Sequence, residues 1–168
     1  MKFPVFAASA VSIRQWEVHK EREATAARQE KLEQDSAEKI DETLLLHGES
    51  RRFAIYQMDS GDEHTYQFMG MESAKNLGYT IDGKDYRMVY AAPWMPTITL
   101  DNIFERFNID RPEDFRGHSL SVSDVIVINR GAEITAYYVD SFGFQELPAF
   151  VQKYKNSRDF HLVKSLDI

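Results

Sequence analysis

The residues best suited to chemistry lie in one polar stretch, residues 110–124 (DRPEDFRGHSLSVSD). His118 is of the residue type that titrates near neutral pH and acts as a general acid or base. Arg116 can bind an anion such as a phosphate through two parallel hydrogen bonds. With Asp124 nearby, these side chains could supply the acid, the base and the cation that phosphodiester cleavage needs. His118, Arg116 and Asp124 are therefore the catalytic candidates.

The same stretch also suits a purely structural role. Asp and Ser side chains readily accept hydrogen bonds from neighbouring backbone amides, and Gly117 gives the chain conformational freedom. A long connection that leads into a buried strand needs such bonds. We favour this structural interpretation, and we expect that the protein is not an enzyme.

The sequence lacks the motifs of common cofactor and catalytic sites. It contains no P-loop, GxGxxG, HExxH, GxSxG or CxxC pattern. It has no cysteine, which excludes disulfides and thiolate metal sites, and its five histidines form no i,i+4 pair on a helix. The sequence therefore predicts neither a metal site nor a cofactor.

Two further stretches have the composition of protein-binding surfaces. The loop 92–96 (APWMP) sets a Trp–Met pair between prolines, and the turn 137–144 (YYVDSFGF) combines aromatic rings with an Asp. The alternatives are a cover over the core for the loop and core aromatics beside an Asx-type turn for the second stretch. The predicted partner-binding residues, drawn from these stretches, the polar loop and the N-terminal helix, are Trp16, Trp94, Met95, Arg116, His118, Tyr138, Asp140 and Phe142.

The N-terminal part predicts one long helix. From about Ser12 to Leu46 the chain has no Gly or Pro and is rich in Glu, Lys, Arg, Gln and Ala. Ser12 is the expected cap, and Gly48 the expected stop. The apolar residues are sparse and follow no sustained heptad, which argues against a long coiled coil. The helix is either a solvated arm or a surface for a partner or a second copy.

The remainder predicts strands mixed with short helices. The expected strands are 53–58, 86–91, 125–129 and 133–139, with a further edge strand at 160–163. The expected helices are 66–77, 99–108 and 147–154, and the Asp82–Gly83 dipeptide predicts a hairpin turn. The fold class is therefore α+β: a long N-terminal helix followed by a mostly antiparallel sheet with short packing helices. The predicted division is a helical extension, 1–50, and an α+β domain, 51–168.

Charge limits the classes of partner. The 168 residues carry 27 Asp and Glu against 20 Lys and Arg, a net charge of −7. Because binding to nucleic acid requires clustered positive charge, the balance argues against direct nucleic-acid binding and favours a basic protein partner. No stretch has the apolar length of a membrane span. Pro4 interrupts the short apolar run of the N-terminus, so we expect no signal peptide and a cytoplasmic protein.

The α+β part resembles a known family. The segments that carry the resemblance to the YodL-like domain are FAIYQM (53–58), YRMVYA (86–91), TLDNIFERFN (99–108), PEDFRGHSLSVSDVIVIN (112–129) and YYVDSFGF (137–144). The resemblance covers about residues 51–155 and leaves the N-terminal helix outside. It implies an accessory protein of a conjugative element or phage that protects incoming DNA from host defence. It transfers no catalytic residue to this chain.

Three functions follow as expectations. The first is a protein that binds and inhibits a host defence nuclease, of the restriction or CRISPR-effector type, through an acidic docking surface. The second is an enzyme that processes nucleic acid with the Arg116/His118 loop. The third is a structural or regulatory module that dimerises through residues 12–46.

Overall fold

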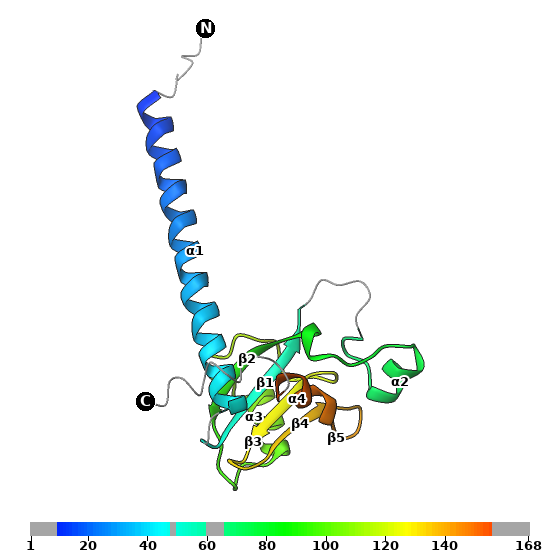
Figure 1. Ribbon diagram of the computed structural model, residues 1–168. Helices are drawn as coiled ribbons and strands as arrows, with labels where there is room; N and C mark the ends of the chain where they lie inside the picture. The colour runs from blue at the N-terminus through cyan, green and yellow to red at the C-terminus, as the bar shows by residue number, and fades with distance from the viewer. Residues whose placement is uncertain (1–9, 48–49, 60–65, 156–168) are drawn as a thin grey trace. The chain divides into compact units, whose positions relative to one another are not determined.

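The computed structural model describes residues 10–47, 50–59 and 66–155 (Figure 1). Contacts along the chain divide it into two units, Met1–Lys39 and Ile40–Ile168. The helix α1 (Ala10–His47) begins in the first unit and ends in the second. None of the helices in the described ranges is long and apolar enough to cross a membrane.

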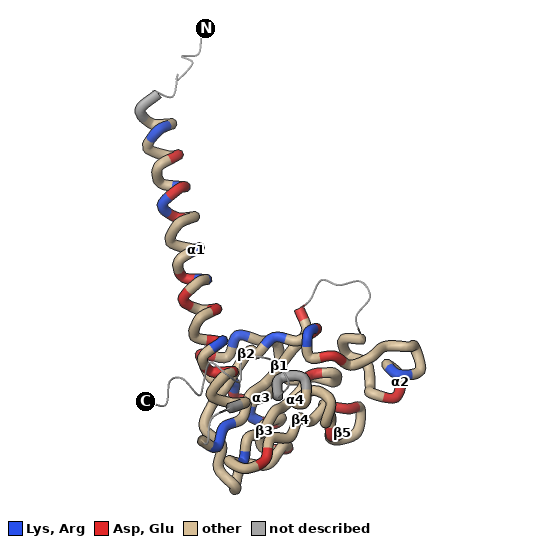
Figure 2. Tube along the Cα trace, viewed as in Figure 1, with Lys and Arg blue, Asp and Glu red and all other residues tan. Residues whose placement is uncertain are grey.

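The first unit confirms the long helix. Side chains along this part of α1 are almost all exposed, and charged residues of both signs alternate along it (Figure 2). Neighbouring turns are joined by pairs such as His19–Glu23 at 3.2 Å, and the Lys20 ammonium lies 4.2 Å from the centre of the Trp16 ring. The helix begins at Ala10, so Ser12 lies within it and the predicted cap is wrong. Gly48 lies outside the described residues.

The second unit contains an antiparallel sheet, as the sequence predicted. Within the described residues the strand order is β2-β1-β3-β4-β5, and all neighbouring pairs are antiparallel. The strands are β1 (Arg52–Met58), β2 (Tyr86–Pro93), β3 (Val125–Asn129), β4 (Ile134–Val139) and β5 (Phe144–Glu146). The fold class is thus α+β, with β3 at the centre of the sheet.

Both faces of the sheet are buried, which explains the uninterrupted apolar run of β3. One core cluster contains Ala54, Tyr56 and Val127 of the strands, together with Phe150 of α4 (Pro148–Lys155). The opposite cluster contains strand residues such as Ile55 and Ile126, together with Ile103 and Phe107 of α3 (Leu100–Ile109). A strand with packed layers on both sides has no polar face, so its sequence does not alternate.

The shorter elements differ from the predictions in places. The expected helix 66–77 is reduced to α2 (Met71–Asn76), and the residues before it form a turn. Asp82 does not sit in a hairpin: its carboxylate accepts a hydrogen bond from the Lys84 amide and caps the 3₁₀ helix η1 (Gly83–Asp85). The strand β5 follows the turn at 140–143 and was not predicted. The edge strand expected at 160–163 lies outside the described residues.

The last turns of α1 belong to the compact domain. Leu45 and Leu46 are buried in the core, and the side-chain amide of Asn129 donates a 2.7 Å hydrogen bond to the Leu45 carbonyl. The Tyr56 hydroxyl donates to Glu42 at 3.0 Å, and Asp41 forms an ion pair with Arg52, also at 3.0 Å. This unit begins at Ile40, earlier in the chain than the division expected at residue 50.

Candidate functional site

Three segments meet where β1 and β4 end and β3 begins. We call residues 66–72, 117–124 and 140–143 the three-loop site. The Phe68 amide donates to the Ser123 hydroxyl at 2.8 Å, and the Met71 amide donates to Asp140 Oδ1 at 3.1 Å. The Ser123 amide donates to the Val139 carbonyl at 2.9 Å. The first two bonds join residues 55 and 69 positions apart in sequence, and the third joins residues 16 positions apart.

Gln57 organises the middle segment. It follows Phe53 and Ile55 on one face of β1, yet its side chain is buried. Its amide nitrogen donates to the His118 carbonyl and to Asp124 Oδ2, both at 2.9 Å, and its amide oxygen accepts from the His118 backbone N–H at 3.0 Å. Both amide hydrogens and the oxygen are therefore used, which makes this buried polar side chain stable and holds the loop at His118.

The tautomer of His118 follows from its contacts. Its Nδ1 lies 2.7 Å from the Ser119 carbonyl, which can only accept, so Nδ1 carries a hydrogen. The 3.2 Å contact between Nδ1 and the Gln57 amide nitrogen joins two donors and is not a hydrogen bond. The other ring nitrogen, Nε2, is buried without a hydrogen-bond partner among the described residues, 3.8 Å from Asp124 Oδ1.

Asp124 is the buried carboxylate of the site, with 1% of its surface exposed. Burial raises its pKa to about 6, while hydrogen bonds from the Ser121 amide and Gln57 and the nearby His118 oppose the rise. Its Oδ2 accepts from the Ser121 amide at 2.8 Å. The carboxyl is thus an anchor for the loop, and its ionisation is costly in the folded protein.

This raised pKa predicts a pH dependence of stability. In the unfolded chain Asp124 ionises near pH 4, so between about pH 4 and 6 the folded protein holds the proton more tightly. The contribution of this group to the free energy of unfolding is therefore full below pH 4 and is lost as the pH rises to 6. Urea denaturation measures the free energies of unfolding of wild type and Asp124→Asn. We expect the difference between these two free energies to change by on the order of 1–3 kcal/mol between pH 4 and pH 6.

The other carboxylates of the protein are present in both chains and cancel in that comparison. A difference between wild type and Asp124→Asn that stays constant from pH 4 to pH 8 would contradict an Asp124 with a raised pKa.

The backbone around the site adopts an uncommon conformation. Among the described residues, Phe68 and Ser123 are the non-glycine residues in the left-handed region, with φ of 64° and 83°. They are also the two residues joined by the 2.8 Å bond from the Phe68 amide to the Ser123 hydroxyl. Such a conformation costs about 1–3 kcal/mol per residue and persists only where the surroundings impose it.

Two tyrosine hydroxyls hold the backbone of these segments in the left-handed conformation. The Tyr86 hydroxyl donates to the Ser123 carbonyl at 2.8 Å, and the Tyr138 hydroxyl donates to the Met69 carbonyl at 2.7 Å. Burial raises the pKa of both hydroxyls, which therefore stay protonated and remain donors. The segment 66–70 is therefore fixed on both sides of Phe68.

The third segment packs tightly against the first. A Cβ added to Gly70 would lie 2.7 Å from Ser141 Oγ and 2.9 Å from Asp140 Oδ1. Asp140 Oδ1 also accepts from the adjacent Ser141 amide at 2.8 Å, a bond to the next residue and not the bond two residues on that defines an Asx turn. Of the predicted residues, Asp140 and the fully buried Tyr138 support the site from within. Phe142 of the same turn is 94% exposed.

The remaining predicted residues are distributed over the chain. Arg116 is exposed next to the middle segment. Trp94 lies at the opposite end of β1, where its amide donates to the Arg51 carbonyl and its indole N–H to the Ile98 carbonyl, both at 3.0 Å. Met95 beside it is 59% exposed, and Trp16 on α1 is 58% exposed. The structure therefore brings together His118, Asp124, Tyr138, Asp140 and Phe142, and leaves Trp94, Met95 and Trp16 elsewhere.

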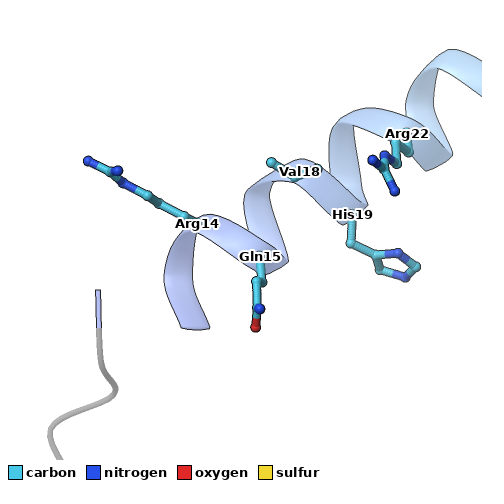
Figure 3. A pocket seen from close by; sticks show the side chains of 5 residues that line it. All are labelled: Arg14, Gln15, Val18, His19 and Arg22. Atoms are coloured by element: carbon cyan, nitrogen blue, oxygen red, sulfur yellow. The ribbon is translucent and has the colours of Figure 1, made fainter. Parts of the chain in front are cut away.

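His118 is poorly placed to act as a general base. A general base must reach its substrate, and the His118 nitrogen that has a lone pair is buried. The described residues contain no cluster of three or more side chains that could hold a metal ion. The hollow along α1 is lined by five residues, all of which belong to that single helix (Figure 3). A second hollow of about 350 Å³ lies between α2 and the start of α4 and is lined mainly by apolar side chains.

Sequence reasoning missed Gln57, Phe68 and Ser123. Gln57 did carry a signal, because it occupies the same face of a predicted strand as Phe53 and Ile55, and a polar residue on a buried face needs partners. Phe68 carried none, since its left-handed backbone depends on Ser123, which is 55 residues away in sequence.

The comparisons with known proteins identify one family. The family model described as YodL-like domain matches residues 52–150, which contain all three segments of the site. The searches of curated proteins and of solved structures give no match.

Proposed function

This chain belongs to the YodL-like domain family, and from that premise we propose that it is an accessory protein of a mobile element that binds and inhibits a host defence nuclease. The proposed mechanism is docking: the domain occupies a basic surface of the nuclease that otherwise binds DNA or RNA. Such a mechanism requires an acidic domain and no chemistry of its own.

The observation that carries the proposal is the place of the negative charge. The family-matched residues 52–150 contain fifteen Asp and Glu against eight Lys and Arg, whereas the rest of the chain contains twelve of each sign. The matched domain therefore carries −7, whereas residues 1–51 carry −2 and residues 151–168 carry +2, and these two contributions cancel. A domain with this excess is repelled by nucleic acid and attracted to proteins that bind nucleic acid.

The enzymatic alternative has less support. It requires that His118 and Arg116 act on one phosphate, but the hydrogen bonds of His118 hold the loop in place and its second ring nitrogen is buried. Dimerisation through α1 also has less support, because the exposed apolar residues of that helix follow no heptad.

A plasmid-transfer experiment tests the proposal. Three otherwise identical recipient strains would carry a type I restriction system, a DNA-cleaving CRISPR effector, or neither, and would receive a plasmid that both systems target. We expect expression of the full chain to raise transfer at least tenfold in one of the two defended strains and to leave transfer into the undefended strain unchanged.

Charge supplies the control. A variant with exposed carboxylates of the domain replaced, such as Asp101→Asn, Glu105→Gln and Glu113→Gln, should lose protection in proportion to the charges removed. Equal transfer with and without the chain in both defended strains would overturn the proposal. Protection that survives this variant, together with cleavage of a nucleic acid by the purified protein that is lost in His118→Ala, would favour the enzymatic alternative.

A further inference from the structure

The three-loop site presents two exposed aromatic rings. Phe142, at the tip of the turn 140–143, is 94% exposed, and Phe68 is 60% exposed. The Phe68 ring lies 5.6 Å from that of His118, centre to centre. An apolar ring exposed to water lacks the stabilisation that burial of its surface would give. The tight turn at Phe142 would form equally well with a polar residue at this position.

The Phe68 ring is held in a rigid setting. Its left-handed backbone is fixed by Ser123 on one side, and the adjoining Met69 carbonyl by Tyr138 on the other. Backbone strain of this kind is more often found at binding sites than elsewhere. A ring that is already ordered loses little entropy when a partner covers it, which favours its use as a contact.

The charge around the two rings indicates the kind of partner. The segments 66–72, 117–124 and 140–143 contain the carboxylates Glu72, Asp124 and Asp140 and no Lys or Arg, and the exposed Arg116 directly precedes the second segment. Glu72 is exposed and Asp140 half-buried, so negative charge accompanies the rings at the surface. Aromatic faces beside carboxylates attract guanidinium groups, because the ring quadrupole and the nearby negative charge act in the same direction.

We propose that the three-loop site is the docking surface for an arginine-rich protein surface, with Phe68 and Phe142 stacking on guanidinium groups and Glu72 pairing with them. This inference rests on the proposed function and names the part of the domain that performs it. It assigns the contact to the end of the sheet at Phe68, and not to α1 or to the loop at Trp94.

A fluorescently labelled nona-arginine peptide, with nona-lysine as its comparison, tests the surface without knowledge of the nuclease. Fluorescence anisotropy should show tighter binding of nona-arginine than of nona-lysine to the full chain. Phe68→Ala and Phe142→Ala should each weaken nona-arginine binding about two- to fivefold, and the double variant about fivefold or more. Phe142→Tyr, which keeps the ring, should bind as wild type does.

Matched controls distinguish the site from general acidity. Trp16→Ala and Met95→Ala remove apolar side chains that are as exposed as Phe68 but lie in other parts of the chain, and they should leave the affinity unchanged. Equal affinity for the two peptides, or equal losses in all variants, would overturn the docking surface. Because this assay contains no nuclease, a positive result combined with failure of the plasmid-transfer test would reject the proposed function alone.

Two other occupants are outcomes of the same experiment. If Phe68→Ala and Phe142→Ala weaken binding of a single-stranded oligothymidine more than binding of nona-arginine, the rings stack on bases and the proposal is wrong. If these variants change the mass of the protein in solution, the surface contacts a second copy and the proposal is equally wrong.

Discussion

Replacement of Gly117 by Ala is expected to lower the free energy of unfolding by about 3–4 kcal/mol, measured by urea denaturation. The added Cβ would overlap the Gln57 side-chain oxygen and would lie 3.0 Å from the Phe115 ring. Gln57 cannot move aside, because it is buried and its amide holds the backbone of His118 and the carboxylate of Asp124. The substitution therefore either compresses the loop or breaks these bonds, and both are costly.

Gly78→Ala is the matched control. Gly78 has φ of 85° and no atom within 4 Å of an added Cβ, so Ala there carries only the strain of the left-handed backbone, about 1 kcal/mol. A second control places Gly117→Ala in a Gln57→Ala background, where the obstructing side chain is absent. We expect the Gly117 substitution to lose most of its effect there. Equal losses in the two backgrounds would show that Gln57 is not the obstacle.

Replacement of Phe107 by Ala should destabilise the domain by about 3–5 kcal/mol. Phe107 is fully buried on α3, and its ring centre lies 4.8 Å from that of Tyr90, 4.9 Å from that of Phe115 and 6.2 Å from that of Phe53. Removal of the ring leaves a cavity between α3, two strands and the loop that leads to the three-loop site. Urea denaturation at a single pH measures the loss.

The same chemical change at the surface provides the comparison. Phe142→Ala removes a ring that is 94% exposed, and we expect a loss of at most about 0.5 kcal/mol. This variant therefore stays folded in the peptide-binding assay. If Phe142→Ala cost as much as Phe107→Ala, Phe142 would be a core residue, and its assignment to a docking surface would be wrong.

Most of the elements could be predicted because their signals are local, whereas η1 and β5 were missed. The face made by Ile103 and Phe107 defines α3, and Thr99 caps it through a bond from the Asn102 amide to its hydroxyl at 3.1 Å. The start of α2 could not be predicted in this way. The segment before Met71 has helix-compatible residues, but its backbone is captured by the distant side chains of Ser123 and Asp140. Tertiary hydrogen bonds outweigh helix propensity there, since each is worth more than the propensity of a residue.

Only part of the candidate site could be predicted, because residue type is a local signal and burial depends on distant residues. The polar stretch at 110–124 identified His118 and Asp124, and the aromatic turn identified Asp140 and Phe142, because residue type alone marks them. Residue type does not reveal which of them are covered. The structure divides the group into inner supports, Asp124 and Tyr138, and an outer residue, Phe142.

The bond between the Asn129 side chain and the Leu45 carbonyl bears on where the protein can be cut. A fragment trimmed to the family-matched residues 52–150 would lose two leucines from the interior and leave a buried amide on the central strand without its acceptor. We therefore expect a fragment that begins near Ile40 to be more stable than one that begins at Arg52. The last turns of α1, from Ile40 onward, are thus part of the domain's own fold.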